Sequence, residues 1–202
     1  MTRTSTAGRT FRAEPLTKAE VDRLLGQCSS RAPTGIRNRA LIIVMYRAGL
    51  RISEALALRP SDVNPERGTL RVLHGKGDKP RTVSLDPGAM SVLMRWIDRR
   101  AACGFRNGPL FCTLKGTPVL GGYVRDMLKR LKVKAGIEKR IHPHGLRHTH
   151  AAELVSEHAP MNMIREQLGH ASLATTDRYL RDIAPADVID FGRQRSWSEG
   201  DA

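Results

Sequence analysis

Six polar residues of this 202-residue sequence have side chains that could act together on a phosphate ester. They are Arg51, Lys76, His144, Arg147, His170 and Tyr179. Cationic groups that converge on one phosphate stabilise the charge that develops on its oxygens during displacement. A tyrosine hydroxyl held beside them would be a suitable attacking group. The set therefore indicates phosphodiester chemistry, provided that the fold brings the six residues together.

Each of these residues, taken alone, also has a simpler structural explanation. Arg51 could form an ordinary helix-capping ion pair with Glu54, three residues later. Lys76 lies between two glycines and could be a solvated turn residue. Tyr179 could be an ordinary core residue. A tyrosine hydroxyl has a pKa of about 10, so it becomes a nucleophile only beside cations or a proton acceptor. Local spacing leaves these alternatives open.

Zinc binding is the obvious alternative for the segment IHPHGLRHTHAAEL, which holds four of the seven histidines. His144 and His148 are four residues apart, but the segment lacks the glutamate of an HExxH motif and has no cysteine nearby. His144 and Arg147 instead form a pair of donors suited to one oxyanion. We expect His148 and His150 to pack in the interior or to cap a helix, and we expect no metal or other cofactor.

The charge balance predicts a polyanionic partner. Lysine and arginine total 34 against 20 aspartate and glutamate residues, which gives a net charge of +14. Nucleic acid is the commonest such partner, although a generally basic protein, such as a ribosome-associated one, would have a similar composition. Only four Phe, two Trp and three Tyr are present, too few for extensive stacking on unpaired bases. Double-stranded DNA bound through its phosphates is the better prediction.

Other features of the sequence predict a cytoplasmic location. The longest apolar stretch, residues 40–46, is too short to span a membrane, and no secretion signal opens the chain. The three cysteines are not in metal-binding spacing and fit a reducing compartment. We expect no membrane partner.

The secondary-structure signals predict an α+β protein, mainly α, with a small antiparallel sheet. Thr17 and Glu20 form a capping box for a helix ending near Gln27, followed by a loop over residues 29–36. Two β-prone runs joined by HGKGDKP predict a hairpin at residues 69–73 and 81–85. A third short strand is expected at residues 109–113. Further helices are expected at 37–48, from 53, and at 87–102, 123–133, 143–157, 161–168 and 172–181.

Four segments, read in order, resemble the catalytic domain of tyrosine recombinases, the phage integrase family. They are AGLRISEALAL, HGKGDKPRTVSL, HPHGLRHTHAAEL and QLGHASLATTDRYL. The resemblance covers roughly residues 16–181 and implies the helical catalytic fold of that family with its small antiparallel sheet. It also implies that the domain is catalytically competent, because no residue of the family's catalytic set is substituted.

The resemblance assigns a role to each residue of the set. Arg51 and Arg147 look like the arginines that clamp the non-bridging oxygens of the scissile phosphate. Lys76 is similar to the hairpin lysine that protonates the departing 5′ oxygen. His144 looks like the histidine of the HxxR motif, which contacts the phosphate and helps proton transfer, and His170 matches the second histidine, in the LGH motif. Tyr179 matches the nucleophile, and Glu54 an acidic residue that supports the site.

The activity implied by the resemblance is site-specific recombination or integration. Tyr179 would cut duplex DNA through a 3′-phosphotyrosyl intermediate, and a 5′ hydroxyl would reverse the step. One alternative is a DNA-relaxing enzyme similar to type IB topoisomerases. Another is a non-cleaving DNA-binding regulator that lacks the clamp domain. We expect DNA contacts from basic residues of the hairpin and of the helix at 123–133, namely Lys79, Arg81, Arg125, Lys129 and Arg130.

The expected organisation is a basic flexible arm at residues 1–14, a catalytic domain at 15–182 and a C-terminal tail at 183–202. The N-terminal core-binding domain usual in the family is expected to be absent. Strand exchange implies a homotetramer on two duplexes, with an accessory DNA-bending protein or a full-length recombinase as a further partner. The expected setting is the nucleoid of a bacterium or archaeon, or a phage-encoded function.

Overall fold

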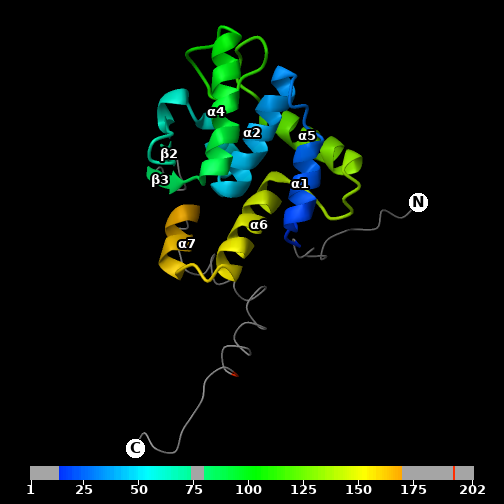
Figure 1. Ribbon diagram of the computed structural model, residues 1–202, viewed down its shortest axis with the longest axis vertical. Coiled ribbons are helices and arrows are strands. Elements are labelled where there is room, and N and C mark those ends of the chain that lie inside the picture. Colours follow the sequence, from blue (N-terminus) through cyan, green and yellow to red (C-terminus); the bar gives the residue numbers. More distant parts are fainter. Residues whose placement is uncertain (1–13, 74–79, 170–192, 194–202) are drawn as a thin grey trace, which may run out of the picture.

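The computed structural model describes residues 14–73, 80–169 and 193 (Figure 1). The described chain is mainly helical and has one small antiparallel sheet, which confirms the predicted fold class. Its elements are α1 (Lys18–Gly26), α2 (Pro33–Arg47), α3 (Ile52–Ala57), a short 3-10 helix (Pro60–Asp62), β1 (Val63–Asn64), β2 (Thr69–Val72), β3 (Arg81–Ser84), α4 (Pro87–Ala102), α5 (Gly121–Lys134), α6 (Pro143–Ser156) and α7 (Met161–Leu168).

Local capping signals set the starts of α1 and α4. The Thr17 hydroxyl accepts a hydrogen bond from the Glu20 backbone N–H at 3.2 Å, and the Glu20 carboxylate accepts one from the Thr17 N–H at 2.7 Å. Asp86 likewise caps α4 by accepting from the Ala89 N–H at 3.0 Å. Such caps satisfy backbone donors that have no partner within the helix. The predicted positions of both helices are confirmed.

Helix α2 begins earlier than the sequence predicted. Residues 33–36 were expected to be loop, but Pro33 is the first residue of the helix. Proline is favourable there because its fixed φ suits the helix and its missing N–H is not needed. Gly35 packs so closely on the preceding turn that a Cβ atom would lie 2.3 Å from the Ser29 carbonyl oxygen. The tight turn before α2 therefore depends on this glycine.

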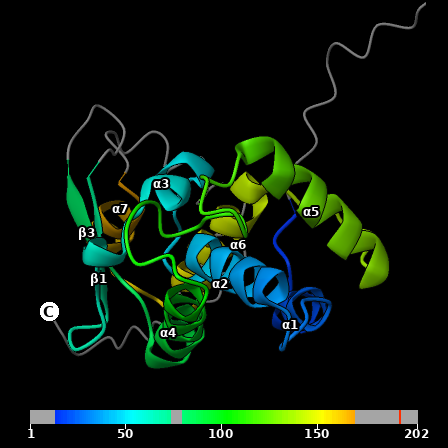
Figure 2. The same cartoon turned by 90° about the horizontal axis from the view of Figure 1, so that it is seen from above.

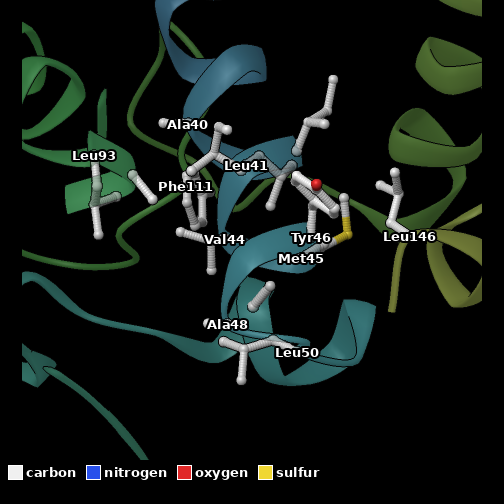
Figure 3. Close-up of a cluster of buried hydrophobic side chains, with 14 of the residues drawn as sticks. Ala40, Leu41, Val44, Met45, Tyr46, Ala48, Leu50, Leu93, Phe111 and Leu146 are labelled. Carbon is white, nitrogen blue, oxygen red and sulfur yellow. The ribbon is translucent and has the colours of Figure 1, made fainter. Parts of the chain in front are cut away.

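Helix α2 lies at the centre of the hydrophobic core. Its residues 40–46 are buried on all sides, between α4 on one face and α6 on another. Figure 3 shows Leu41 and Val44 near Leu93 and Phe111, with Leu146 beyond the opposite face of the helix. A helix that is apolar all round is stable only when it is enclosed in this way. The end of α2, which leads to Arg51, is thus fixed by the core.

The sheet has the strand order β1-β2-β3, with antiparallel pairing throughout. The predicted hairpin is confirmed, since Thr69 pairs with Ser84 and Val72 with Arg81. The prediction of a strand at residues 109–113 is wrong. The strand that completes the described sheet is β1, which precedes the hairpin in the sequence. Phe111 and its neighbours are fully buried in the core, and the only ladder contact described there is an isolated bridge from Cys112 to Pro118.

The last described helix packs against the sheet. Helices α5, α6 and α7 confirm the predicted helical segments to within one or two residues at each end. Helix α7 lies beside β3 and next to α6, while α5 lies at the opposite side of the molecule (Figure 2). Gly169 ends α7 in the left-handed conformation, with φ of 62°. The predicted helix at residues 172–181 falls outside the described residues.

No helix within the described ranges is long and apolar enough to cross a membrane.

Candidate phosphate-binding site

A buried carboxylate, Glu54, organises the candidate site. Its residue is only 3% exposed, and it lies in α3 one turn after Arg51. It accepts a hydrogen bond from Arg51 Nη1 at 2.7 Å and another from the Arg51 backbone N–H at 2.8 Å. The same side chain therefore fixes the start of α3 and the direction of the Arg51 guanidinium. Arg51 itself stays accessible, with 29% of its side chain exposed.

A second arginine, Arg81 of β3, binds the same carboxylate in a two-pronged arrangement. Its Nη1 and Nη2 atoms each lie 2.9 Å from an oxygen of Glu54. Burial alone would raise the pKa of Glu54, but the hydrogen bonds from Arg81 and Arg51 outweigh it, so the pKa lies below its ordinary value. Glu54 is therefore ionised at neutral pH and remains a strong acceptor.

Arg147, in α6, is 2% exposed and approaches Glu54 from the other side, with 3.9 Å between Nη1 and Oε2. Its Nη1 donates to the Gly49 carbonyl at 2.6 Å, and its Nη2 donates to the Leu168 carbonyl. One guanidinium thus joins the end of α2, the start of α3 and the end of α7. Gly49 has φ of 61°, and a Cβ there would lie 2.6 Å from the His150 ring. Only glycine allows this close approach.

His144 lies in the first turn of α6, three residues before Arg147, and is exposed. Partial loss of hydration by its ring, together with the positive charge of Arg147, lowers its pKa below the ordinary value. The ring is therefore neutral at pH 7. A neutral imidazole has one nitrogen that donates and one that accepts, which suits it to proton transfer.

The described residues thus bring together three of the six predicted catalytic residues, Arg51, His144 and Arg147, with Glu54, the predicted supporting residue. Arg51 and His144 face solvent while Glu54 and Arg147 are buried behind them. The positive groups are held in place before any ligand binds, which is what stabilisation of a developing negative charge requires. This arrangement is suited to binding a phosphate oxygen.

The other three predicted catalytic residues lie outside the described residues, namely Lys76, His170 and Tyr179. The predicted DNA contact Lys79 also lies outside them. The end of α7 lies beside the site, because Arg147 donates a hydrogen bond to the Leu168 carbonyl. In the sequence, Gly169 immediately precedes His170.

The predicted DNA-contacting residues fall into two classes. Arg125, Lys129 and Arg130 are exposed on α5. Lys129 lies 3.6 Å from Asp126, a weak contact for two exposed charges. Arg81, in contrast, has a side chain that is 13% exposed and turned toward Glu54.

Within residues 14–73 and 80–169, no three histidine, cysteine or acidic side chains are grouped so as to hold a metal ion. His148 and His150 are buried in α6, as expected from the sequence.

Sequence reasoning missed a second ionic cluster beside α2. Arg47 donates to Asp86 at 2.8 Å and to Glu153 at 2.9 Å, and Glu153 also accepts from the Tyr46 hydroxyl. The cluster ties α2 to the cap of α4 and to α6. Its members are distant in sequence, so no local spacing could have revealed them.

The sequence matches the profile of the Phage integrase family over residues 14–184. The chain therefore belongs to the phage integrase family, as its motifs predicted.

Among curated proteins, the chain is 36% identical over 167 residues to tyrosine recombinase XerD of Ralstonia nicotianae. That match covers 81% of this chain and 54% of the relative. The chain spans about half the length of the curated relatives it matches.

Two solved structures have a similar fold, and each is 30% identical in sequence to this chain. The XerA recombinase has a TM-score of 0.79 at 30% identity, with coverage of 92% of this chain and 66% of that chain. The XerH site-specific recombinase, bound to palindromic difH substrate in a post-cleavage complex, has a TM-score of 0.74 at 30% identity. That match covers 89% of this chain and 52% of XerH.

Proposed function

We propose that this chain is the catalytic part of a site-specific DNA recombinase, which cuts and rejoins duplex DNA through a covalent tyrosine intermediate. The observation that carries the proposal is the buried Glu54 carboxylate, with Arg51 and Arg147 directed around it and His144 alongside. A carboxylate in this place is not itself a ligand for phosphate. It holds cations in the geometry that a phosphate needs.

In the proposed reaction, the Tyr179 oxygen forms a bond to the scissile phosphorus. The bond from phosphorus to the 5′ oxygen breaks, so the 3′ end becomes a phosphotyrosyl ester and the 5′ end a hydroxyl. Arg51 and Arg147 neutralise the non-bridging oxygens in the transition state. Lys76 supplies the proton to the 5′ oxygen. Either His144, whose lowered pKa leaves its ring neutral, or His170 takes the proton of the tyrosine.

Rejoining is the same step in reverse, with a 5′ hydroxyl from the partner duplex as the attacking group. The ester bond to Tyr179 conserves the energy of the original phosphodiester, so the exchange needs no nucleotide. The arginines provide the positive charge that a metal ion supplies in many other phosphoryl-transfer sites.

The proposed substrate is duplex DNA. The net charge of +14 and the exposed cations of α5 suit a polyanion. The similar recombinase XerH is seen bound to its difH substrate. Four protomers on two duplexes, in the nucleoid of the cell, would be required for strand exchange. An accessory DNA-bending protein or a full-length recombinase is a further proposed partner.

The test is covalent trapping on nicked duplexes of randomised sequence, in EDTA, with Tyr179→Phe as the control. A protein–DNA adduct that requires Tyr179 is the expected result. Joining of two duplexes would then separate recombination from simple relaxation of supercoiled plasmid. Binding without any adduct from the randomised pool would instead support a non-cleaving regulator.

A further inference from the structure

Arg81 is placed where it can connect three parts of the site. It is the first residue of β3, after the hairpin segment that carries Lys76. Its two Nη atoms bind the two oxygens of Glu54, and its Nε lies 3.4 Å from the Gln167 carbonyl oxygen. All three of its nitrogens thus have partners on α3 and α7. A guanidinium can do this because it is planar and presents donors along two edges.

The backbone at the end of α7 rests directly on this guanidinium. A Cβ atom at Gly169 would lie 2.8 Å from Arg81 Cζ and Nε. Gly169 also has φ of 62°, which disfavours any other residue. The residue just before His170 is therefore glycine for two reasons, and one of them is contact with Arg81.

A second contact fixes α7 on the same strand. The Gln167 side-chain oxygen accepts from the Ser84 backbone N–H at 3.1 Å, and Gln167 Nε2 donates to the Ser84 carbonyl at 3.0 Å. Strand β3 is at the edge of the described sheet, where backbone groups lack a neighbouring strand. The amide of Gln167 pairs with Ser84 as another strand would. Helix α7 is therefore joined to β3 through the backbone of that strand and through the side chain of Arg81.

We propose that Arg81 is a positioning residue, which holds Glu54 and the Gly169 turn in register so that Arg51 and Arg147 meet one phosphate. This inference rests on the proposed function and assigns Arg81 a role other than DNA contact. A guanidinium that left Glu54 for a DNA phosphate would deprive a buried carboxylate of its bidentate partner, which is strongly unfavourable. Arg81 thus acts on the reaction through Glu54.

The test compares Arg81→Gln and Arg81→Lys with Arg71→Gln. Arg71 is a matched control from the neighbouring strand β2, with 59% of its side chain exposed and its own partner, Asp62. We expect Arg81→Gln to lower the first-order rate of adduct formation at saturating DNA by about 10²-fold, because displaced catalytic groups lose rate on that scale. Arg81→Lys should rescue little, since lysine is a point charge. The duplex Kd and its salt dependence should not change.

The opposite pattern would overturn the proposal. A weaker Kd and a salt slope reduced by about one phosphate, with the wild-type rate at saturation, would make Arg81 a DNA contact. The Arg71→Gln control should match the wild type in both measurements. If Arg81→Gln does not fold, Arg81→Lys gives the same comparison, because lysine keeps the positive charge but cannot make the two parallel hydrogen bonds to Glu54.

A measurement without DNA separates this inference from the proposed function. The pKa of the Glu54 carboxyl group, followed by NMR titration, should rise in Arg81→Gln and not in Arg71→Gln. The charged groups facing Glu54 are Arg51 at the N-cap of α3, Arg81 on β3 and Arg147 on α6. If the pKa of Glu54 rises in Arg81→Gln but the wild-type protein never forms an adduct, only the proposed function is refuted. An unchanged pKa and an unchanged cleavage rate would refute only the role of Arg81.

Discussion

At the scale of single residues, Glu54 determines how the cations of the site are directed. Three arginines from different elements approach one buried carboxylate. Isolated buried charges are costly, and this group of opposite charges offsets the cost only while every member is present. The geometry of the phosphate site and the stability of the fold are therefore linked through the same side chain.

Replacement of Glu54 by Gln should reduce both stability and cleavage. The variant keeps the size of the side chain but leaves Arg81 and Arg147 without a buried counter-charge. We expect the free energy of unfolding to fall by about 3 kcal/mol at pH 7, and less at acidic pH. The wild-type carboxylate contributes stability above its ordinary pKa of 4.5, and this is lost as the pH falls through the lowered folded value. Urea denaturation at pH 7 and pH 3.5 measures the free energy of unfolding of the wild type and of Glu54→Gln. If the variant were destabilised equally at the two pH values, the role of the charge would be contradicted.

His150 should make stability depend on mildly acidic pH. It is 4% exposed, and neither ring nitrogen has a hydrogen-bond partner among the described residues. Burial, with the charges of Arg47 and Arg147, lowers its pKa to about 4. The unfolded chain takes up this proton first as the pH falls below about 6.5, so the folded state should lose about 2 kcal/mol by pH 5. His150→Leu should remove that loss in urea titrations at pH 7 and 5. A variant with the wild-type pH dependence would show that another group is responsible.

At the scale of elements, the described site residues come from the start of α3 and from α6, and two arginines connect these helices to the end of α2, to β3 and to α7. Arg147 joins α6 to α2 and α7 through backbone carbonyls, and Arg81 joins β3 to α3 and α7. Helix α7 is only eight residues long and would not be stable alone. Its position depends on these contacts and on the small apolar cluster of Ile164 and Leu168 with α6.

Loss of the Gln167 amide should loosen α7. Gln167→Ala removes the three hydrogen bonds between Gln167 and Ser84, and we expect stability to fall by about 1 kcal/mol. Amide exchange at Ser84 should become faster. Glu166→Ala is the matched control, since Glu166 is exposed on the same helix. Equal exchange rates in the two variants would mean that Gln167 does not anchor the helix.

The elements that sequence predicted best are those with local signals. The capping residues Thr17 and Asp86 and the stop at Gly169 lie at the helix ends where they were expected. Strand β1 was not predicted, because a strand of two residues is too short to show an alternating pattern of apolar and polar side chains. Its pairing depends on the turn that follows.

The site was predictable in its residue types but not in its internal contacts. The spacing of Arg51 to Glu54 suggested an ion pair, and the structure shows one. Arg81 lies beside Lys79 in a basic run, so its sequence context indicated an exposed DNA contact. Its direction is set by a carboxylate 27 positions away and by the docking of α7, which no local pattern encodes.

At the scale of the whole molecule, the helices and the sheet surround α2, and α5 packs against α3 and α6, the helices that carry the residues of the candidate site. Figure 2 shows α5 on the side opposite the sheet. We expect DNA binding and chemistry to be separable by mutation, because the exposed cations of α5 are not members of the Glu54 cluster.

Removal of exposed cations from α5 should weaken binding without changing the chemical step. Lys129→Ala or Arg130→Ala should each raise the duplex Kd and reduce the slope of log K against log salt by about one phosphate contact. Arg99→Ala, an exposed arginine on α4, is the control for net charge. The cleavage rate at saturating DNA should equal that of the wild type in all three. An unchanged slope in the α5 variants would remove that helix from the DNA interface.

The most direct test of the account is to locate the covalent bond. Adduct formed on a nicked duplex would be digested with protease and nuclease, and the nucleotide-bearing peptide identified by mass spectrometry. We predict a 3′-phosphoryl nucleotide on Tyr179, absent from Tyr179→Phe and formed much more slowly in Arg51→Ala. A nucleotide attached to any other residue, or adduct of equal yield from Tyr179→Phe, would contradict the account.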